Sequence, residues 1–211
     1  MGERFGLYLV LSNPVAGYEK CAEAAVAEGV RYLQLRMKGA AQQEVLAVAR
    51  RLRTMTLGTA TRFIVNDEVG VAIACDADGV HLGQTDASIS DARRRWRTPG
   101  KVFGLSTHDE TQARAAEAVH PSYIGIGPVF PTPTKQPPDP ALGPERAANI
   151  ARVSPLTTVA IGGIDTSNLP WVLAVGFTNF AVVRAVCGRS DPRTAISELQ
   201  ATWRKVARQA G

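Results

Sequence analysis

The stretch YIGIGPVFPTPTK, residues 123–135, joins a buried strand to a stiff polar loop. Its first half, 123–129, is apolar and β-branched, and its glycines predict that another group approaches the backbone closely. Its second half, 130–135, contains Pro131 and Pro133, which remove two backbone donors and favour an extended course. We therefore expect a strand that ends in a rigid loop.

The loop carries groups that suit a polyanion. Thr132 and Thr134 supply hydroxyls between the prolines, and Lys135 supplies an ammonium group. Such donors suit a phosphate or a diphosphate. The alternative is a proline-rich surface turn that happens to contain a lysine.

Outward from this stretch, short β-branched runs alternate with longer alanine-rich runs. The pattern predicts strands at about 5–12, 31–36, 61–66, 79–82, 101–106, 123–129, 157–162 and 179–186. It predicts helices at about 16–28, 41–57, 67–75, 88–97, 108–119, 143–152, 166–175 and 191–209. Eight strand–helix pairs without a break in composition predict one α/β domain, a (β/α)8 TIM barrel over residues 1–211.

An open, doubly wound sheet is the alternative architecture. Such folds usually place a glycine-rich dinucleotide fingerprint after the first strand. Here the first predicted strand is followed by Ser12-Asn13-Pro14. The sequence therefore favours the closed barrel.

Composition indicates an ordinary globular protein. The chain has 211 residues, is 45% hydrophobic and 20% charged, and carries a net charge of +5. A basic balance suits nucleic acid or an anionic small molecule, but the densest basic cluster, 93–97, reads as a solvated helix face. We expect no nucleic-acid partner.

Neither cysteine usage nor hydropathy indicates secretion or a membrane. Cys21, Cys75 and Cys187 lie far apart among small apolar residues, which predicts buried free thiols and a reducing compartment. No run is long enough to span a membrane, and the N-terminus lacks a signal-peptide pattern. We expect no membrane association and a cytoplasmic location.

Polar residues gather where the predicted strands end, which is where a TIM barrel places its active site. Gln34, Arg36 and Lys38 share one face of the second strand because side chains alternate along it. The other strand ends carry Asn66, Asp67, Gln84, Asp86, Ser106, Thr107, His108, Gly162, Gly163 and Arg184.

Asp67 and Asp86 end neighbouring predicted strands, so their carboxylates can converge. Mg²⁺ typically binds one or two carboxylates together with substrate phosphates. We therefore expect Mg²⁺ as cofactor at this pair. The alternative is that each aspartate only caps the helix that follows it.

A second anion region is expected near the last two strands. Gly162 and Gly163 precede a predicted helix, and freed backbone N–H groups there can cradle a phosphate. Arg184, on the eighth predicted strand, would lie beside them. The alternative role of the glycines is a tight turn that requires positive φ.

The histidines are candidate acid–base groups. His81 lies inside a predicted strand and reads as a core histidine, whereas His108 is more open. No residue pair shows the nucleophile–base pattern of covalent catalysis. The site therefore suits an enzyme that positions phosphorylated substrates.

These residues resemble the thiamin phosphate synthase family. The resemblance runs from about residue 7 to 187, through LQLRMKG (33–39), FIVND (63–67), DGVHLGQTD (78–86), GLSTHD (104–109), YIGIGPVFPTPTKQ (123–136), VAIGGI (159–164) and AVVRAV (181–186). It implies a TIM barrel and a Mg²⁺-dependent transferase. That enzyme joins 4-amino-5-hydroxymethyl-2-methylpyrimidine diphosphate to a thiazole phosphate and releases diphosphate.

The resemblance also implies roles for individual residues. The substrate contacts would be Gln34, Arg36, Lys38, Asn66, Ser106, Thr132, Thr134, Lys135 and Gly163. Lys38, Ser106 and Lys135 would serve catalysis, and Asp67 and Asp86 would bind Mg²⁺. The implied mechanism is dissociative: diphosphate leaves, the aminopyrimidine stabilises the cation, and the thiazole nitrogen attacks.

Two positions depart from the family pattern. Met37 stands where an acidic residue is common, but by parity it faces away from the site. Arg184 stands where the family usually has serine, so it either binds the thiazole phosphate through two hydrogen bonds or fills the site. Rival functions are a thiazole tautomerase of the same fold and a non-catalytic sensor of thiamin phosphate. The oligomeric state is open, and a homodimer is compatible with the sequence.

Overall fold

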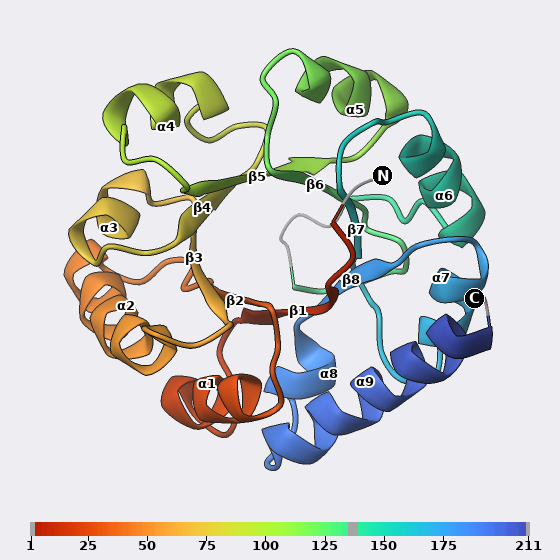
Figure 1. Ribbon diagram of the computed structural model, residues 1–211, viewed down its shortest axis with the longest axis horizontal. Helices are drawn as coiled ribbons and strands as arrows, with labels where there is room; N and C mark the ends of the chain where they lie inside the picture. The colour runs from red at the N-terminus through yellow and green to blue at the C-terminus, as the bar shows by residue number, and fades with distance from the viewer. Residues whose placement is uncertain (1–2, 135–138, 210–211) are drawn as a thin grey trace.

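The computed structural model describes residues 3–134 and 139–209, which form a closed barrel of eight parallel strands ringed by helices (Figure 1). The strands are β1 (Gly6–Leu11), β2 (Tyr32–Leu35), β3 (Arg62–Asn66), β4 (Gly79–Leu82), β5 (Val102–Thr107), β6 (Tyr123–Ile126), β7 (Thr158–Ile161) and β8 (Asn179–Val182). The helices are α1 (Tyr18–Ala27), α2 (Gln42–Thr56), α3 (Val69–Ala74), α4 (Ile89–Arg95), α5 (Glu110–Glu117), α6 (Pro144–Arg152), α7 (Leu169–Ala174), α8 (Arg184–Cys187) and α9 (Pro192–Gln209).

The strands pair in chain order, and β1 closes the ring by pairing with β8. The predicted TIM barrel is therefore confirmed, and the open-sheet alternative is wrong. Parallel strands joined through helices place all eight carboxyl ends at one mouth of the barrel. The polar strand ends predicted from the sequence consequently share one side of the molecule.

Side chains along each strand alternate between two cores. On β1, Leu7 and Leu9 pack outward against the helices, whereas Tyr8 and Val10 point into the barrel. The barrel interior contains an aromatic cluster, in which Tyr8, Tyr32 and Tyr123 meet. Buried tyrosine hydroxyls need hydrogen-bond partners, and these are found at the site described below.

Glycine is required where β6 leaves the barrel. A Cβ added at Gly127 would lie 2.0 Å from the carbonyl oxygen of Ile161 on β7, so no other residue fits at that approach. The expectation that another group approaches this backbone closely is thus confirmed. The strand itself ends at Ile126, before the predicted end at residue 129, because the chain turns there into the loop toward Thr132.

The eighth strand also ends earlier than predicted. It stops at Val182, and Val183 leaves the extended conformation with φ −119° and ψ −81°. Arg184 is therefore the first residue of the short helix α8 and is not part of a strand. A single helical turn is too short to show a 3.6-residue period, which is why the sequence pattern missed it.

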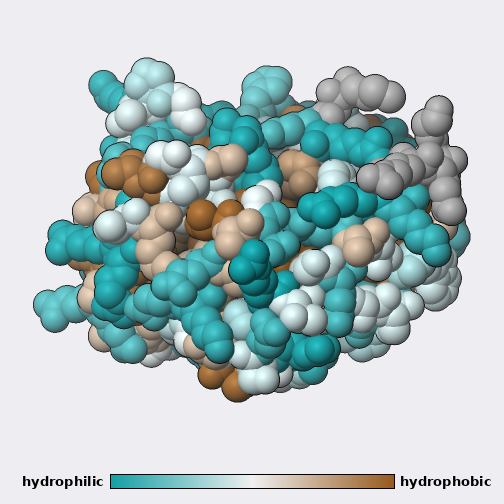
Figure 2. Space-filling model, turned by 60° about the horizontal axis from the view of Figure 1, so that its bottom comes forward, coloured by the Kyte–Doolittle hydropathy of each residue, from teal (hydrophilic) through white to brown (hydrophobic). Residues whose placement is uncertain are grey.

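The cysteines and the surface of the described residues have the character that the composition predicts. Cys21, Cys75 and Cys187 are free and buried, as predicted. No helix in residues 3–134 and 139–209 is long and apolar enough to cross a membrane. On the face in Figure 2, hydrophilic residues predominate and hydrophobic ones form small separate groups.

Candidate active site

A cavity of about 960 Å³ opens at the carboxyl ends of the strands. The sequence-predicted residues among its lining are Gln34, Arg36, Lys38, Asn66, Asp67, Asp86, Ser106, Thr132, Thr134, Gly163 and Arg184. Lys135 lies outside the described residues. The barrel thus brings every described candidate to one cavity, while the role of each stays a prediction.

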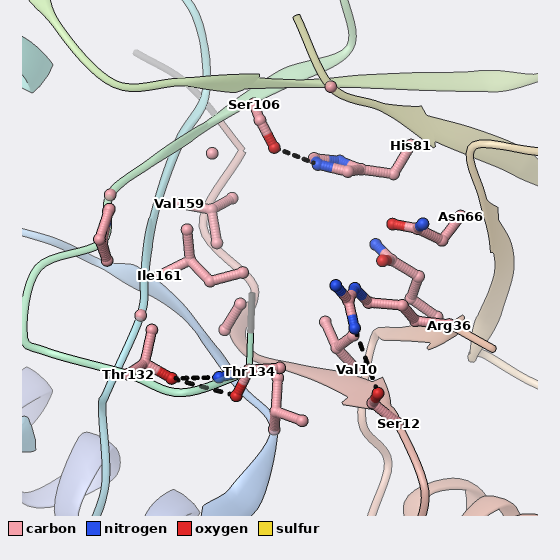
Figure 3. A pocket seen from close by; sticks show the side chains of 18 of the residues that line it. Val10, Ser12, Arg36, Asn66, His81, Ser106, Thr132, Thr134, Val159 and Ile161 are labelled. Atoms are coloured by element: carbon pink, nitrogen blue, oxygen red, sulfur yellow. Dashed lines mark hydrogen bonds between the residues drawn. The ribbon is translucent and has the colours of Figure 1, made fainter. Parts of the chain in front are cut away.

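The cavity has two sides with different chemistry (Figure 3). Arg36, Asn66 and His81, from or just after β2, β3 and β4, line one side. Thr132 and Thr134 lie across from them, and their hydroxyls are 3.0 Å apart. Apolar side chains of β7 lie on the side of the threonines, so the cavity offers a surface for a ring as well as donors for anions.

The carboxylate pair lies at the ends of β3 and β4. Asp67 forms an ion pair with Lys38, and Asp86 accepts a 2.7 Å hydrogen bond from the Gly83 N–H. Burial, together with hydrogen bonding to Asp86, raises the pKa of Asp67. Burial opposes ionisation of Asp86 as well, but hydrogen bonds from Asp67 and Gly83 outweigh it, so the pKa of Asp86 is lowered. The pair therefore shares its negative charge unequally.

Neither aspartate caps a helix. The N-cap of α3 is Glu68 and the N-cap of α4 is Ser88, whose side chain accepts from the Asp91 N–H. The capping alternative is therefore wrong for both. Asp67 instead has φ +61°, a left-handed conformation that non-glycine residues adopt mainly where surrounding structure imposes it.

The donors around Asp67 and Asp86 fit a magnesium ion. Two carboxylates in contact favour a cation, and Asn66 and Gln84, which carry amide oxygens, line the same cavity. No group of three His, Cys, Asp or Glu side chains in the described part of the chain could hold a metal without other ligands. Such a pair suits Mg²⁺, which usually completes its octahedron with water and substrate phosphates.

The opposite rim is built from β7, β8 and α8. Gly162 and Gly163 have φ values of +101° and +65°, so the turn explanation for the glycines holds, and both line the cavity. Arg184 is exposed and lines the cavity at the start of α8. The pKa of Asp165 is lowered by a hydrogen bond from Ser167 and also by the charge of Arg184. Loops after strands 7 and 8 with a short extra helix form the usual TIM-barrel phosphate site.

Sequence reasoning missed a hydrogen-bonded group inside the barrel. His81 is 8% exposed, and its Nε2 lies 2.9 Å from Ser106 Oγ while its Nδ1 lies 3.0 Å from the Tyr123 hydroxyl. Burial lowers the pKa of His81 to about 4, so the ring is neutral near pH 7. The expected core position of His81 is confirmed, but the residue also contacts a predicted site residue. Tyrosines inside apolar strands were the available signal, because a buried hydroxyl requires a partner.

His108 and Gln84 support the loops around the cavity. His108 Nδ1 lies 2.7 Å from the carbonyl oxygen of Gly127, and Gln84 Nε2 donates to the carbonyl oxygen of Ser106 at 2.5 Å. His108 precedes Asp109, the N-cap of α5. Both side chains thus tie strand ends to each other.

The fold and the site together define a (β/α)8 barrel whose mouth gathers carboxylates, cations and hydroxyl donors around one cavity. A family model described as thiamine monophosphate synthase matches residues 7–186. The chain therefore belongs to the thiamine monophosphate synthase family, which classes it with transferases.

Similar proteins carry the same description. The chain is 45% identical over 186 residues to a thiamine-phosphate synthase of Gloeobacter violaceus, covering 88% of this chain and 54% of that protein. It is 44% identical over 181 residues to the thiamine-phosphate synthase of Myxococcus xanthus, covering 84% and 83%. The thiamine phosphate pyrophosphorylase structure from Pyrococcus furiosus superposes with a TM-score of 0.86 at 33% identity, covering 96% of each chain. The chain thus spans about half of the Gloeobacter relative and most of the other two.

Proposed function

We propose that this chain is a thiamine phosphate synthase. It joins 4-amino-5-hydroxymethyl-2-methylpyrimidine diphosphate to 4-methyl-5-(2-phosphooxyethyl)thiazole and releases diphosphate. The observation that carries the proposal is that one cavity gathers a carboxylate pair, the cations Arg36 and Lys38, and an opposite rim with hydroxyl groups and Arg184. A transferase that uses a diphosphate and a second phosphate needs this combination.

The pyrimidine diphosphate binds on the side of the cavity formed by β2 to β5. Arg36 and Lys38 follow β2 and bring positive charge to the cavity, and Asn66 ends β3 beside them. The Arg36 guanidinium is half-buried and donates to Ser12 Oγ at 3.3 Å, which limits where it can reach. Gln34 is 3% exposed and lines the cavity, and we propose that it contacts the pyrimidine ring.

The thiazole phosphate falls on the opposite rim. Thr132 and Thr134 supply hydroxyls, Gly163 presents its backbone to the cavity, and Arg184 supplies charge. Because Arg184 is exposed at the rim, it leaves the cavity open. It is therefore available to contact the phosphate in place of the usual serine. We also propose a role for Lys135, which lies outside the described residues.

The chemical step needs stabilisation of a leaving anion and no enzyme nucleophile. The C–O bond to diphosphate breaks first, and the aminopyrimidine ring carries the positive charge until the thiazole nitrogen forms the new C–N bond. Ser106 donates a hydrogen bond to the departing oxygen, and Lys38 offsets its charge. Mg²⁺ held by Asp67 and Asp86 would neutralise the diphosphate further. Apolar β7 side chains line the cavity and would shield the pyrimidine cation from water.

A single assay tests this proposal. The purified chain is incubated with both substrates and Mg²⁺, and thiamine phosphate is followed by fluorescence after oxidation to thiochrome. We expect product that EDTA suppresses and that excess Mg²⁺ restores. Asp86→Asn is the matched variant, and it should lose at least about 100-fold in kcat/KM while its circular dichroism is retained.

The assay also separates the rival functions. A folded chain that binds thiamine phosphate without making it would overturn the synthase proposal in favour of a sensor. Isomerisation of a thiazole phosphate without condensation would favour the tautomerase. Product that EDTA leaves unchanged would remove Mg²⁺ and its two carboxylate ligands from the proposal.

A further inference from the structure

A continuous chain of side-chain hydrogen bonds crosses the barrel beneath the cavity. Gln34 Nε2 donates to the Tyr8 hydroxyl at 2.8 Å, and that hydroxyl lies 2.7 Å from the Tyr123 hydroxyl. Tyr123 lies 3.0 Å from His81 Nδ1, and His81 Nε2 lies 2.9 Å from Ser106 Oγ. These hydrogen bonds link Gln34 on β2 with Ser106 on β5. In the proposed function Gln34 contacts the pyrimidine ring and Ser106 contacts the diphosphate of the same substrate.

Packing holds the middle of this chain in place. Tyr8 and Tyr123 are 2% and 1% exposed, and their rings meet edge to face with centroids 5.6 Å apart. The His81 ring stacks on Tyr123 at an interplanar angle of 17°. A Cβ at Gly104 would lie 2.3 Å from the Tyr123 hydroxyl and 2.6 Å from His81 Nδ1. Glycine at this position therefore makes room for the Tyr123–His81 contact.

The direction of the hydrogen bonds follows from the donor at one end. The Gln34 amide nitrogen only donates, so the Tyr8 oxygen accepts from it. The buried Tyr8 hydrogen then needs an acceptor, and Tyr123 is its other hydrogen-bond partner in the described structure. Tyr123 in turn donates to His81 Nδ1, so the neutral ring carries its hydrogen on Nε2 and donates to Ser106 Oγ. The Ser106 hydrogen is thereby left for the cavity.

We propose that Tyr8 and Tyr123 are positioning residues that hold His81 in its Nε2–H tautomer, so that the Ser106 hydroxyl faces the cavity as a hydrogen-bond donor. The benefit of this arrangement rests on the proposed function, in which the departing diphosphate oxygen needs a donor. Reversing the donor–acceptor direction of every hydrogen bond would require the Gln34 amide to exchange the positions of its oxygen and nitrogen. Ser106 would then donate to His81 and could not offer its hydrogen to the substrate.

Nitrogen-15 NMR of the histidine side chains in the full chain reads the tautomer without any activity. His81→Gln assigns the His81 signals among the three histidines. We expect a protonated Nε2 and an unprotonated Nδ1 in the wild type, and a mixture of tautomers in Tyr123→Phe. Tyr8→Phe removes the donor one step further away and should shift the tautomer ratio less.

Tyr32→Phe is the matched control. The Tyr32 ring packs against both Tyr8 and Tyr123, but its hydroxyl donates to Glu3 outside the chain of hydrogen bonds. It should leave the His81 signals unchanged. A wild type with hydrogen on Nδ1, or a Tyr123→Phe variant that keeps the pure Nε2–H tautomer, overturns the proposal.

Kinetics then test whether the tautomer matters. Tyr123→Phe should lower kcat about tenfold with the KM values nearly unchanged, because the lost effect belongs to the leaving group and not to binding. Tyr32→Phe should keep the wild-type kcat. An unchanged kcat in Tyr123→Phe with an altered tautomer would overturn the positioning role. A wild type that forms no product fails the proposed function instead, and the NMR result still decides the tautomer.

Discussion

At the scale of single residues, the site contains features that reduce the stability of the fold. Asp67 combines a left-handed backbone with a carboxyl group whose pKa is raised by burial and by Asp86. A left-handed backbone and a partly buried carboxylate pair at one position are typical of functional sites. The ion pair with Lys38 relieves only part of this cost, since the Lys38 side chain is 56% exposed.

The raised pKa gives a prediction for stability. The folded chain binds more protons at Asp67 than the unfolded chain between the two pKa values, so the contribution of Asp67 to stability falls as pH rises through that range. Asp67→Asn removes this cost and keeps a residue type that tolerates positive φ. We expect the variant to be more stable by about 1 kcal/mol at pH near 7 without Mg²⁺.

Urea unfolding of wild type and Asp67→Asn at several pH values between about 4 and 7 provides the measurement. The stability difference should shrink as the pH is lowered, because protonation removes the charge in the wild type. Equal free energies of unfolding for wild type and Asp67→Asn at every pH would show that the charged Asp67 carboxylate does not destabilise the fold. The same variant should lose Mg²⁺-dependent turnover, so stability and activity change in opposite directions.

Arg184 gives a second prediction at this scale. Arg184→Ser restores the usual family residue and removes a charge from the cavity rim, so the KM for the thiazole phosphate should rise about tenfold. The KM for the pyrimidine diphosphate should stay constant. Arg189→Ser, an exposed arginine outside the cavity lining, is the control for the loss of one charge. Equal effects of the two substitutions would point to long-range electrostatics and against a direct contact.

At the scale of elements, the phosphate rim depends on how the β6 and β7 loops fit together. Phe130 N–H donates to the Gly162 carbonyl at 3.0 Å, and Val129 N–H donates to the Ile161 carbonyl at 2.8 Å. A Cβ at Gly163 would lie 2.8 Å from both the Phe130 Cβ and the Pro131 carbonyl oxygen. The two loops therefore dock on each other through glycine, and the position of the threonines depends on that contact.

Gly163→Ala should expose this dependence. The variant meets both a φ of +65° and a steric conflict, whereas Gly100→Ala meets a φ of +78° with nothing within 4 Å. Backbone strain should cost each variant about 1 kcal/mol, and the contact should cost Gly163→Ala about 1–3 kcal/mol more. Thermal unfolding compares the two. Similar losses of stability in the two variants would mean that the β6 loop moves away from the added methyl group at no cost in free energy. The KM for the thiazole phosphate should then not change either.

At the scale of the whole molecule, the cavity exists only because the ring closes. Arg36 and Lys38 follow β2, Asp67 and Asp86 follow β3 and β4, and the opposite rim comes from β6, β7 and α8. A ligand that contacts several strand ends binds the folded barrel and not the unfolded chain. Binding should therefore stabilise the entire fold through mass action.

Inorganic diphosphate with Mg²⁺ tests this linkage. At about 100 times its dissociation constant, the complex should add about 2.7 kcal/mol to the free energy of unfolding. Diphosphate alone should add less, because Asp67 and Asp86 would repel it. Thermal shifts with and without Mg²⁺ measure the difference, and Asp86→Asn should abolish the Mg²⁺-dependent part. A shift that ignores Mg²⁺ in the wild type would argue against joint binding.

Local patterns were sufficient to predict the barrel and the residues at its mouth. Periodicity within each strand and polar residues at strand ends depend on near neighbours in the chain, and both survive folding unchanged. The same argument breaks down at α8, where one helical turn carries no period, and at Asp67, where the preference for a cap was overridden by tertiary contacts.

The hydrogen-bond chain through Tyr8, Tyr123 and His81 could not be predicted from the sequence, because it joins residues that are far apart in the chain. Tyr8 and Tyr123 are 115 positions apart, and His81 and Tyr123 are 42 apart. Closure of the ring brings β1, β4 and β6 across from one another, and no local pattern encodes which inward side chains then meet. The fold, the mouth and the chemistry available there could be predicted in advance, because they follow from periodicity between near neighbours in the chain. Which groups share a proton or a charge depends on distances that only the closed barrel sets.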